Sequence, residues 1–535
     1  MDRTPGLIVI QIDGLSRPAL DEILVHGSMP VLGELIGSGH MTLDGWVALL
    51  PPCTPASQAG ILHGNNDGIP GFRWYEKTAD RLLVANHAKD ATEIERRVST
   101  GSGLLAAGGV SVGNLLVGDA AYSHLTMSSI EGDGRPQGRR DGGEFPLDPR
   151  SYLRMLFEMI GELKDEIVQA NRQRREDVRP RMLRGARYAL ERAVTNVPLR
   201  ILSTSVVIHE VQAGRPIIYV DFTGYDEIAH HCGPGRPESH DAVEKIDRSI
   251  GHILDAVALA PRPYRLVLLS DHGQSLGASF RQRYGITLVE LIAGWTGEAS
   301  TFNLATAPVE YADGLTRILH HVAGRRVASA IEGLLERRPG ANHHRASRVV
   351  DGHGAPLSSP ADAQIADVVV CASGNLGLVY FTASRSRMTR KEIETRYPGL
   401  IEGVIAHPGI GTLVLQSVDG VVALGPAGSN FLETGRVVGQ DPLADYGPVA
   451  AEGLRRVAGF ENSGDMLAIG RYDPLADEVV SFEELVGSHG GLGGRQGQPF
   501  IAYPSSWALD DGPLIGSPAV NRQLRRWMSD LRSEA

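Results

Sequence analysis

Short apolar runs that end at an acidic residue recur along the chain. The runs and the acids that follow them are 7–12 with Asp13, 216–220 with Asp221, and 265–270 with Asp271. Such β-branched runs are typical of buried parallel strands. Helix-like stretches follow the three runs at 17–25, 241–258 and 286–293. Strands that alternate with helices predict an α/β core, in which a mostly parallel central sheet carries helices on both faces.

Two regions interrupt this alternation. Helical periodicity over 151–170 and 182–194 predicts a helical insertion at about 150–200. The second region spans about 300–480, and we expect it to form a smaller, inserted α+β cap. Its expected elements are strands at 366–371, 376–381 and 411–415 and a helix at 389–405. The catalytic core then comprises 1–300 and 480–535, and it ends in a helix at 521–531.

The composition of the chain excludes some classes of binding partner and favours one cellular compartment. The 535 residues include 52 Lys and Arg against 63 Asp and Glu, a net charge of −11. We therefore expect no nucleic-acid polymer as a partner, because its phosphates would repel the chain. The three cysteines form no disulfide or zinc-ribbon pattern, which favours a reducing, cytoplasmic location. No run approaches the ~18 apolar residues that span a bilayer.

One stretch is basic against this acidic background. Arg172 to Arg192 contains eight arginines and three acidic residues. We expect a solvated face of the helical insertion. A surface for an anionic substrate or a lipid is the less favoured alternative, and membrane association would depend on it.

Residues that bind metals follow several of the strands. Asp13 and the pair Asp271-His272 end two strands, and Asp226 and His230 are four apart, which puts them on one face of a helix. Carboxylates and imidazoles suit Zn²⁺, and two such ions clamp the oxygens of a phosphoryl group in transfer. Thr54 precedes a helix-like stretch, where backbone N–H groups favour anions.

Taken in order, these segments resemble the alkaline phosphatase superfamily, and most closely its type I phosphodiesterase/nucleotide pyrophosphatase branch. The matching residues are Asp13, Thr54 with Gly64, Asp226 and His230 with Gly233-Pro234, Ser270 to Gly273, and His489-Gly490. The resemblance does not extend to residues 150–200 or 300–480.

The resemblance implies an alkaline phosphatase-like fold and two Zn²⁺ ions, with Mn²⁺ or another divalent metal as the alternative. One ion would be held by Asp13, Thr54, Asp271 and His272, and the other by Asp226, His230 and His489. It also implies that Thr54 attacks phosphorus and forms a phospho-threonine, which water then hydrolyses. The chain is accordingly expected to be a phosphodiesterase that acts on a small phosphoester, with nucleotides as one candidate class.

One departure leaves the substrate open. Phe72 stands where the family has an asparagine that holds a phosphate oxygen, and Arg73 follows it. Arg73, Asn65 and Asn66 are candidates to replace that contact. Because a guanidinium favours a dianion, a phosphomonoesterase or phosphonate hydrolase on the same site is the alternative. A catalytically silent, metal-binding interaction protein is the alternative of another class. The oligomeric state is not indicated.

Other residues compete for the same roles. Ser57 is a second hydroxyl near Thr54, and His231 adjoins His230. Asp221 also ends a strand, but it is too far from His230 for the motif, so we expect a structural role. His353 resembles His489 because glycines flank both.

Overall fold

The computed structural model describes residues 4–130, 149–297, 301–304, 366–509 and 512–533. Its central sheet has the strand order β2-β21-β8-β1-β7-β5-β6. Strands β8, β1, β7, β5 and β6 are parallel, and β21 runs against them. The strands are β1 Gly6–Ile12, β2 Met41–Gly45, β5 Val110–Val112, β6 Tyr122–His124, β7 Ile217–Phe222, β8 Tyr264–Leu269 and β21 Phe500–Pro504.

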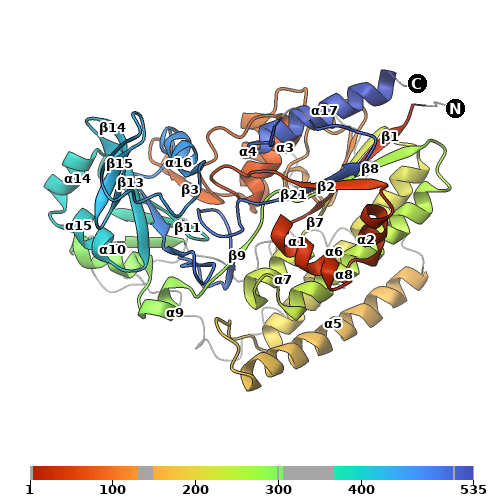
Figure 1. The fold of residues 1–535 in the computed structure, drawn as a ribbon, viewed down its shortest axis with the longest axis horizontal. Coiled ribbons are helices and arrows are strands. Elements are labelled where there is room, and N and C mark those ends of the chain that lie inside the picture. Colours follow the sequence, from red (N-terminus) through yellow and green to blue (C-terminus); the bar gives the residue numbers. More distant parts are fainter. Residues whose placement is uncertain (1–3, 131–148, 298–300, 305–365, 510–511, 534–535) are drawn as a thin grey trace.

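Helices cover both faces of this sheet (Figure 1). Ile8 and Ile10 of β1 pack toward one face, whereas Leu7 and Val9 pack toward the other. The first face carries α1 Arg17–Val25, α2 Pro30–Gly37, α6 Ala186–Gln212, α7 Gly224–Cys232 and α8 Pro237–Val257. The second carries α3 Thr54–His63, α4 Ala88–Val98 and α17 Ser517–Ser533. The α/β fold expected from the alternating pattern is confirmed.

A second sheet lies beside the core, at the left of Figure 1. Its strand order is β10-β11-β12-β17-β13-β14-β15-β16. The strands are β10 Thr301–Leu304, β11 Val368–Ser373, β12 Leu376–Phe381, β13 Ile410–Ser417, β14 Gly420–Gly425, β15 Gly428–Phe431, β16 Arg436–Gly439 and β17 Met466–Gly470. Helices α10 Leu288–Thr296, α14 Arg390–Arg396 and α15 Leu400–Ala406 pack on it, and α16 Ala450–Ala458 contacts β13.

The single helix predicted over 389–405 is wrong, because the structure has two helices there, α14 and α15. Tyr397 between them has φ −130° and ψ 76°, outside the helical region, and Gly399 has φ +85°. Pro398 is the physical reason, since a proline disfavours helical geometry in the residue before it.

Smaller elements join the two sheets. A four-stranded sheet has the order β18-β19-β9-β20, and β3 pairs with β4. These strands are β3 Arg73–Glu76, β4 Arg81–Val84, β9 Ser275–Leu276, β18 Tyr472–Asp473, β19 Glu478–Val479 and β20 Gly487–Ser488. The short helices are η1 Met127–Ser129 and α9 Phe280–Tyr284.

The helical insertion consists of α5 Pro149–Arg175 followed by α6. α6 packs on the sheet and on α8, whereas α5 lies outside α6 along the lower edge of the molecule (Figure 1). The arginines of the basic stretch divide between two environments. Arg172, Arg174 and Arg175 are exposed as expected, but Arg184 and Arg192 are buried. Over the described ranges, none of the helices is both long and apolar enough to cross a membrane.

Candidate active site

The carboxyl ends of β1 and β8 bring the first group of polar side chains together. Gln11 of β1 is in register with Leu269 of β8, so Asp13 and Asp271 leave neighbouring strands at the same edge. His272 lies between them. Its Nε2 is 3.4 Å from Oδ1 of Asp13 and 3.4 Å from Oδ2 of Asp271. All three side chains are fully buried.

The second group begins on α7, which follows β7. Asp226 and His230 occupy one face of this helix, and Oδ2 of Asp226 is 3.0 Å from Nε2 of His230. Gly14, directly after Asp13, packs closely against the side chain of Asp226 on this helix. A Cβ atom on Gly14 would lie 2.1 Å from Oδ1 of Asp226, and the residue has φ +72°. The turn after β1 therefore needs glycine both for its backbone and for space.

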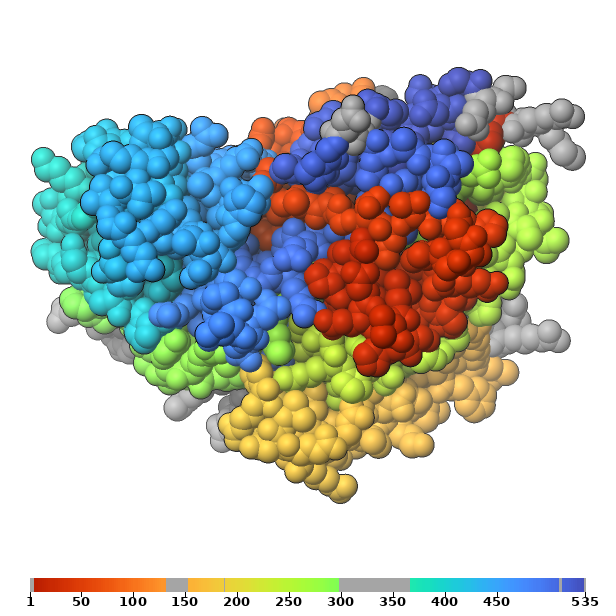
Figure 2. Space-filling view, in the orientation of Figure 1, coloured from red at the N-terminus to blue at the C-terminus, as the bar shows by residue number. Residues whose placement is uncertain are grey.

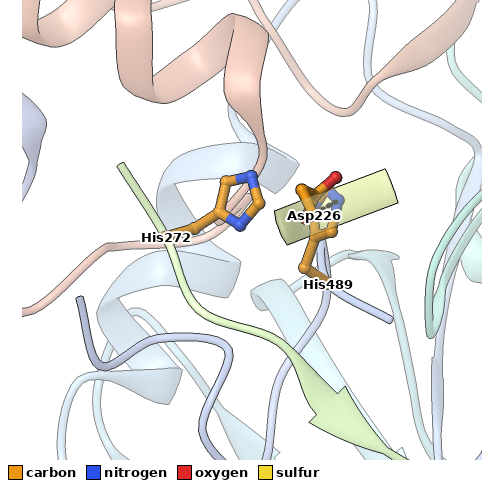
Figure 3. A group of neighbouring side chains, drawn as sticks. All are labelled: Asp226, His272 and His489. Atoms are coloured by element: carbon orange, nitrogen blue, oxygen red, sulfur yellow. Dashed lines mark ion pairs between the residues drawn. The ribbon is translucent and has the colours of Figure 1, made fainter. Parts of the chain in front are cut away.

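His489 completes the second group from the loop after β20. Its Nε2 is 3.2 Å from Nε2 of His230 and 3.8 Å from Oδ1 of Asp226. Its ring stacks on that of His272, with 3.9 Å between centroids. Figure 3 shows Asp226, His272 and His489 converging from three separate segments. The two groups thus form one continuous cluster.

Thr54 is the first residue of α3 and is buried beside this cluster. Its Oγ1 lies 3.3 Å from Nε2 of His272. Pro55 follows it in the first turn, where the fixed proline φ suits a helix start. The unpaired N–H groups of this turn favour a phosphate next to the hydroxyl.

The three histidines share one hydrogen-bond pattern. Nδ1 of His230 lies 2.8 Å from the carbonyl of Gly487, Nδ1 of His489 lies 3.1 Å from that of Pro52, and Nδ1 of His272 lies 3.1 Å from that of Gly273. Because each Nδ1 faces an acceptor, the proton of each neutral ring belongs on Nδ1. The Nε2 lone pairs then point into the cluster, as in metal-binding histidines.

The electrostatics of the cluster demand positive charge. Burial, followed by the charges of Asp271, Asp221 and Asp226, holds the pKa of Asp13 well above its usual range. Burial also raises the pKa of Asp271. Burial and the neighbouring His272 hold the pKa of His489 well below its usual range. Close carboxylates and facing imidazole lone pairs are costly when buried alone, so this donor set fits divalent cations.

The residues predicted to contact the substrate phosphate have protein partners in the structure. Arg73 is buried, where it donates 2.8 Å to the carbonyl of Ala372 and pairs with Glu483. Asn65 and Asn66 follow the C-terminal end of α3. The hydroxyl of Ser517 donates 3.4 Å to the carbonyl of Ala56 in the first turn of α3. Asn66 donates 3.0 Å to Ser517 there. The contact of Arg73, Asn65 and Asn66 with a substrate phosphate stays a prediction.

The competing residues also have definite places. Ser57 lies one turn into α3, beyond the first turn that presents Thr54. Nδ1 of His231 lies 3.1 Å from the carbonyl of Glu227, and its ring packs against Tyr188 of α6 at 4.4 Å. His231 therefore faces the helical insertion, whereas His230 faces the cluster. His353 lies outside the described residues.

Sequence reasoning missed several residues that hold the ligands in place. Gln274 donates to the carbonyl and to the carboxylate of Asp226. Gln58 of α3 donates 2.8 Å to Asp221, which contributes a fourth buried carboxylate near Asp13. Glutamines carry no metal-ligand pattern in a sequence, so only their spacing from the candidate ligands offered a signal.

The comparisons with known proteins come to the same chemistry. The family model of type I phosphodiesterase / nucleotide pyrophosphatase matches residues 7–292. This chain belongs to that family. It is accordingly a metal-dependent hydrolase of phosphoester bonds. The described residues include two neighbouring groups that could hold a metal ion, Asp13 with Asp271 and His272, and Asp226 with His272 and His489. A comparison with curated protein sequences finds no match.

Among solved structures, this family member is similar to phosphonoacetate hydrolase from Sinorhizobium meliloti 1021 in complex with phosphonoformate. The two sequences are 15% identical, the match covers 98% of this chain and 96% of that chain, and the TM-score is 0.47. It is also similar to murine ectonucleotide pyrophosphatase / phosphodiesterase 5, with 10% identity, 98% and 95% covered, and a TM-score of 0.47. A third similar structure is the alkaline phosphatase PafA, with 12% identity, 96% and 93% covered, and a TM-score of 0.46.

Proposed function

We propose that this protein is a dizinc phosphodiesterase in which Thr54 is the nucleophile. One observation carries the proposal. The Oγ1 of Thr54, at the first turn of α3, lies 3.3 Å from His272, the residue common to both groups of metal ligands. A hydroxyl in that position would lie next to bound cations and to the N–H groups of the first helical turn at once.

The donor set supports two cations and zinc as their identity. Asp13, Asp271, His272 and Thr54 would hold one ion, and Asp226, His230 and His489 the other. Mixed imidazole and carboxylate donors suit Zn²⁺ better than Ca²⁺ or Mg²⁺, with Mn²⁺ as the alternative. When bound, the two ions supply the positive charge that acidifies the threonine hydroxyl and balances the charge of the phosphoryl oxygens.

The side chains of the protein then account for the remaining steps. Oγ1 of Thr54 attacks phosphorus, the bond to the leaving alcohol breaks, and a phospho-threonine forms. Water then cleaves the bond between Oγ1 and phosphorus, which returns the threonine and releases the phosphorylated product. The N–H groups of the first turn of α3 stabilise the negative phosphoryl oxygens throughout.

The surroundings of Arg73 favour a diester. A monoester is a dianion, and the sequence offered the Arg73 guanidinium as the cation that would select it. That guanidinium is instead committed to Glu483 and to the carbonyl of Ala372. We therefore infer a small phosphodiester as the substrate, with a nucleotide derivative as one candidate.

We further infer that the second sheet belongs to the cap expected over 300–480. Its strands run from Thr301 to Gly470. Phe280 and Leu288, from α9 and α10, share its hydrophobic cluster, which supports a boundary nearer to 280.

The cytoplasmic location expected from the sequence also stays a proposal. The three cysteines are buried and form no disulfide in the part of the chain that the structure describes.

Metal analysis combined with two chromogenic esters tests the proposed function. The purified protein should hold close to two zinc ions per chain and cleave bis(p-nitrophenyl) phosphate faster than p-nitrophenyl phosphate. Thr54→Ala should lower kcat on the diester by roughly a thousandfold or more. Ser57→Ala is the matched control on the same helix and should keep most of the activity.

The alternatives predict different results. Faster cleavage of the monoester would favour a phosphomonoesterase on the same site. Stoichiometric zinc without turnover of either ester would favour a metal-binding protein. Full activity of Thr54→Ala would refute the nucleophile.

A further inference from the structure

Helix α5 carries its apolar side chains on the outside. Six large hydrophobic residues on this helix are between 43% and 72% exposed. They are Leu153, Leu156, Phe157, Ile160, Ile167 and Val168. Their spacings of three, four and seven place them on one stripe of the helix, about 120° wide. α5 forms the lower rim of the molecule, where its outer side faces away from the core (Figures 1 and 2).

The opposite side of α5 is polar and buried. Glu162, Glu166, Gln169 and Gln173 point inward and are each at most 7% exposed. Arg192 of α6 pairs with Glu162 and with Glu166, and Arg184 donates 3.0 Å to Glu166. Gln169 donates 2.7 Å to Asp241 of α8. This network fixes the rotation of α5, so the apolar stripe cannot turn inward without breaking several buried ion pairs.

This polarity is the reverse of an ordinary surface helix. An amphipathic helix in water buries its apolar stripe and exposes its charges. A contiguous exposed apolar stripe opposite a buried charged face indicates an apolar environment on the outer side, either a membrane or another protein.

The charges on the stripe discriminate between these environments. Lys164, Arg174 and Arg175 share the outer face with the apolar residues and are exposed. The exposed acid nearest to the stripe, Asp165, points to its flank at about 100° from Lys164. A second copy docked on the same stripe would place the same basic residues opposite them. An anionic lipid surface complements both the apolar stripe and its basic residues.

We propose that α5 is an interfacial helix that docks the protein on anionic membrane surfaces. The stripe enters the boundary between headgroups and acyl chains, and Lys164, Arg174 and Arg175 contact lipid phosphates. The inner network with α6 and α8 holds the helix flat against the protein, so the docked enzyme lies with α5 toward the bilayer. This inference does not depend on the reaction proposed above.

Vesicle flotation with the full-length protein tests the docking. Wild type should float with vesicles of phosphatidylcholine that contain about one third phosphatidylglycerol, and it should bind pure phosphatidylcholine weakly. The triple substitution Leu156→Ser, Phe157→Ser and Ile160→Ser should reduce binding to the anionic vesicles at least about tenfold. The control substitutes Val418 and Leu475, which are 89% and 99% exposed outside the stripe, with serine and should float like wild type.

A fluorescent label locates the contact. Because the three native cysteines are buried, Phe157→Cys offers one exposed thiol for an environment-sensitive dye. Its emission should shift to the blue when anionic vesicles are added. The same dye on Leu475→Cys should not respond.

Each other outcome overturns the proposal in a recognisable way. Equal flotation of wild type and the triple variant would exclude the stripe as the docking element. A lipid-free dimer that the triple variant converts to a monomer, without vesicle binding, would assign the stripe to a second copy. A large loss of stability in the triple variant would show that the chain itself covers the stripe. Cleavage of bis(p-nitrophenyl) phosphate in solution should stay unchanged in the variant, so this test and that of the reaction are separate.

Discussion

The hydroxyl of Thr54 and the imidazole of His272 lie 3.3 Å apart, although they are 218 positions apart in the chain. Thr54 begins helix α3 on one face of the central sheet, and His272 follows β8 at the sheet edge. Nε2 of His272 also lies 3.4 Å from Asp13 and from Asp271. The proposed nucleophile therefore lies next to the first group of candidate metal ligands.

Replacing His272 should disable the metal site while leaving the fold intact. His272→Ala is expected to lower kcat on the diester by about a hundredfold or more and to reduce bound zinc from two ions toward one. Metal analysis of the purified variant beside wild type measures the loss. His252→Ala, on the exposed surface of α8, serves as the control and should keep both ions. Two ions retained with full turnover would remove His272 from the ligand set.

Strand ends were the part of this site that the sequence predicted best. Asp13 and Asp271 each follow a short apolar run, and parallel strands bring such ends to one edge whatever the intervening loops do. Asp226 and His230 were predicted for a similar reason, since a spacing of four fixes one helical face. These positions depend on local geometry, which a single sequence carries.

Contacts between segments that are distant in the sequence could not be predicted from local geometry. Arg73 was predicted to contact the phosphate, and no local pattern indicated its ion pair with Glu483, 410 positions later. Arg184 and Arg192 were predicted to be solvated, but both are buried. Nothing in the sequence around them shows that Glu162 and Glu166 of α5 form ion pairs with them. Partner choice across the fold is set by packing, and the charge pattern along the chain does not record it.

The close approach of Gly14 to Asp226 offers a second test. In Gly14→Ala the new Cβ would lie 2.1 Å from Oδ1 of Asp226, on a backbone with φ +72°. We expect Asp226 to shift, zinc affinity to fall, and stability to drop by about 1–3 kcal/mol. Gly27 has the same φ of +72° and open space around it, so Gly27→Ala isolates the backbone strain. Equal zinc binding in the two variants would show that the contact with Asp226 has no bearing on the site.

The ring contact between Tyr188 and His231 links the helical insertion to α7. The ring centroids are 4.4 Å apart, and His231 is adjacent to the proposed ligand His230. Tyr188→Ala should weaken zinc binding by about tenfold through movement of α7, because ligands depend on the residues that orient them. Tyr188→Phe keeps the ring and should restore wild-type affinity. A chelator titration compares the three proteins, and a lower melting temperature without a change in zinc affinity would limit Tyr188 to a structural role.

His63, at the far end of α3 from Thr54, should make stability depend on pH. Nε2 of His63 lies 2.7 Å from Glu95, and Nδ1 lies 3.7 Å from Asp119. Burial alone would lower the pKa of His63, but the interactions with Asp119 and Glu95 outweigh it and raise the pKa to about 9. Because the pKa is higher in the folded state than the unperturbed 6.5, the folded state binds the proton more tightly.

The contribution of His63 is therefore complete below pH 6.5 and is lost as the pH rises through 9. The loss corresponds to at most about 3.5 kcal/mol, from about 1.4 kcal/mol per pKa unit. Urea unfolding of wild type and of His63→Gln should give a difference in unfolding free energy that is largest near pH 6 and shrinks by pH 9.5. Glutamine keeps a donor for Glu95 but does not titrate, so the comparison cancels the other ionising groups. A difference that stays constant over this range would mean that His63 is not protonated in the folded protein.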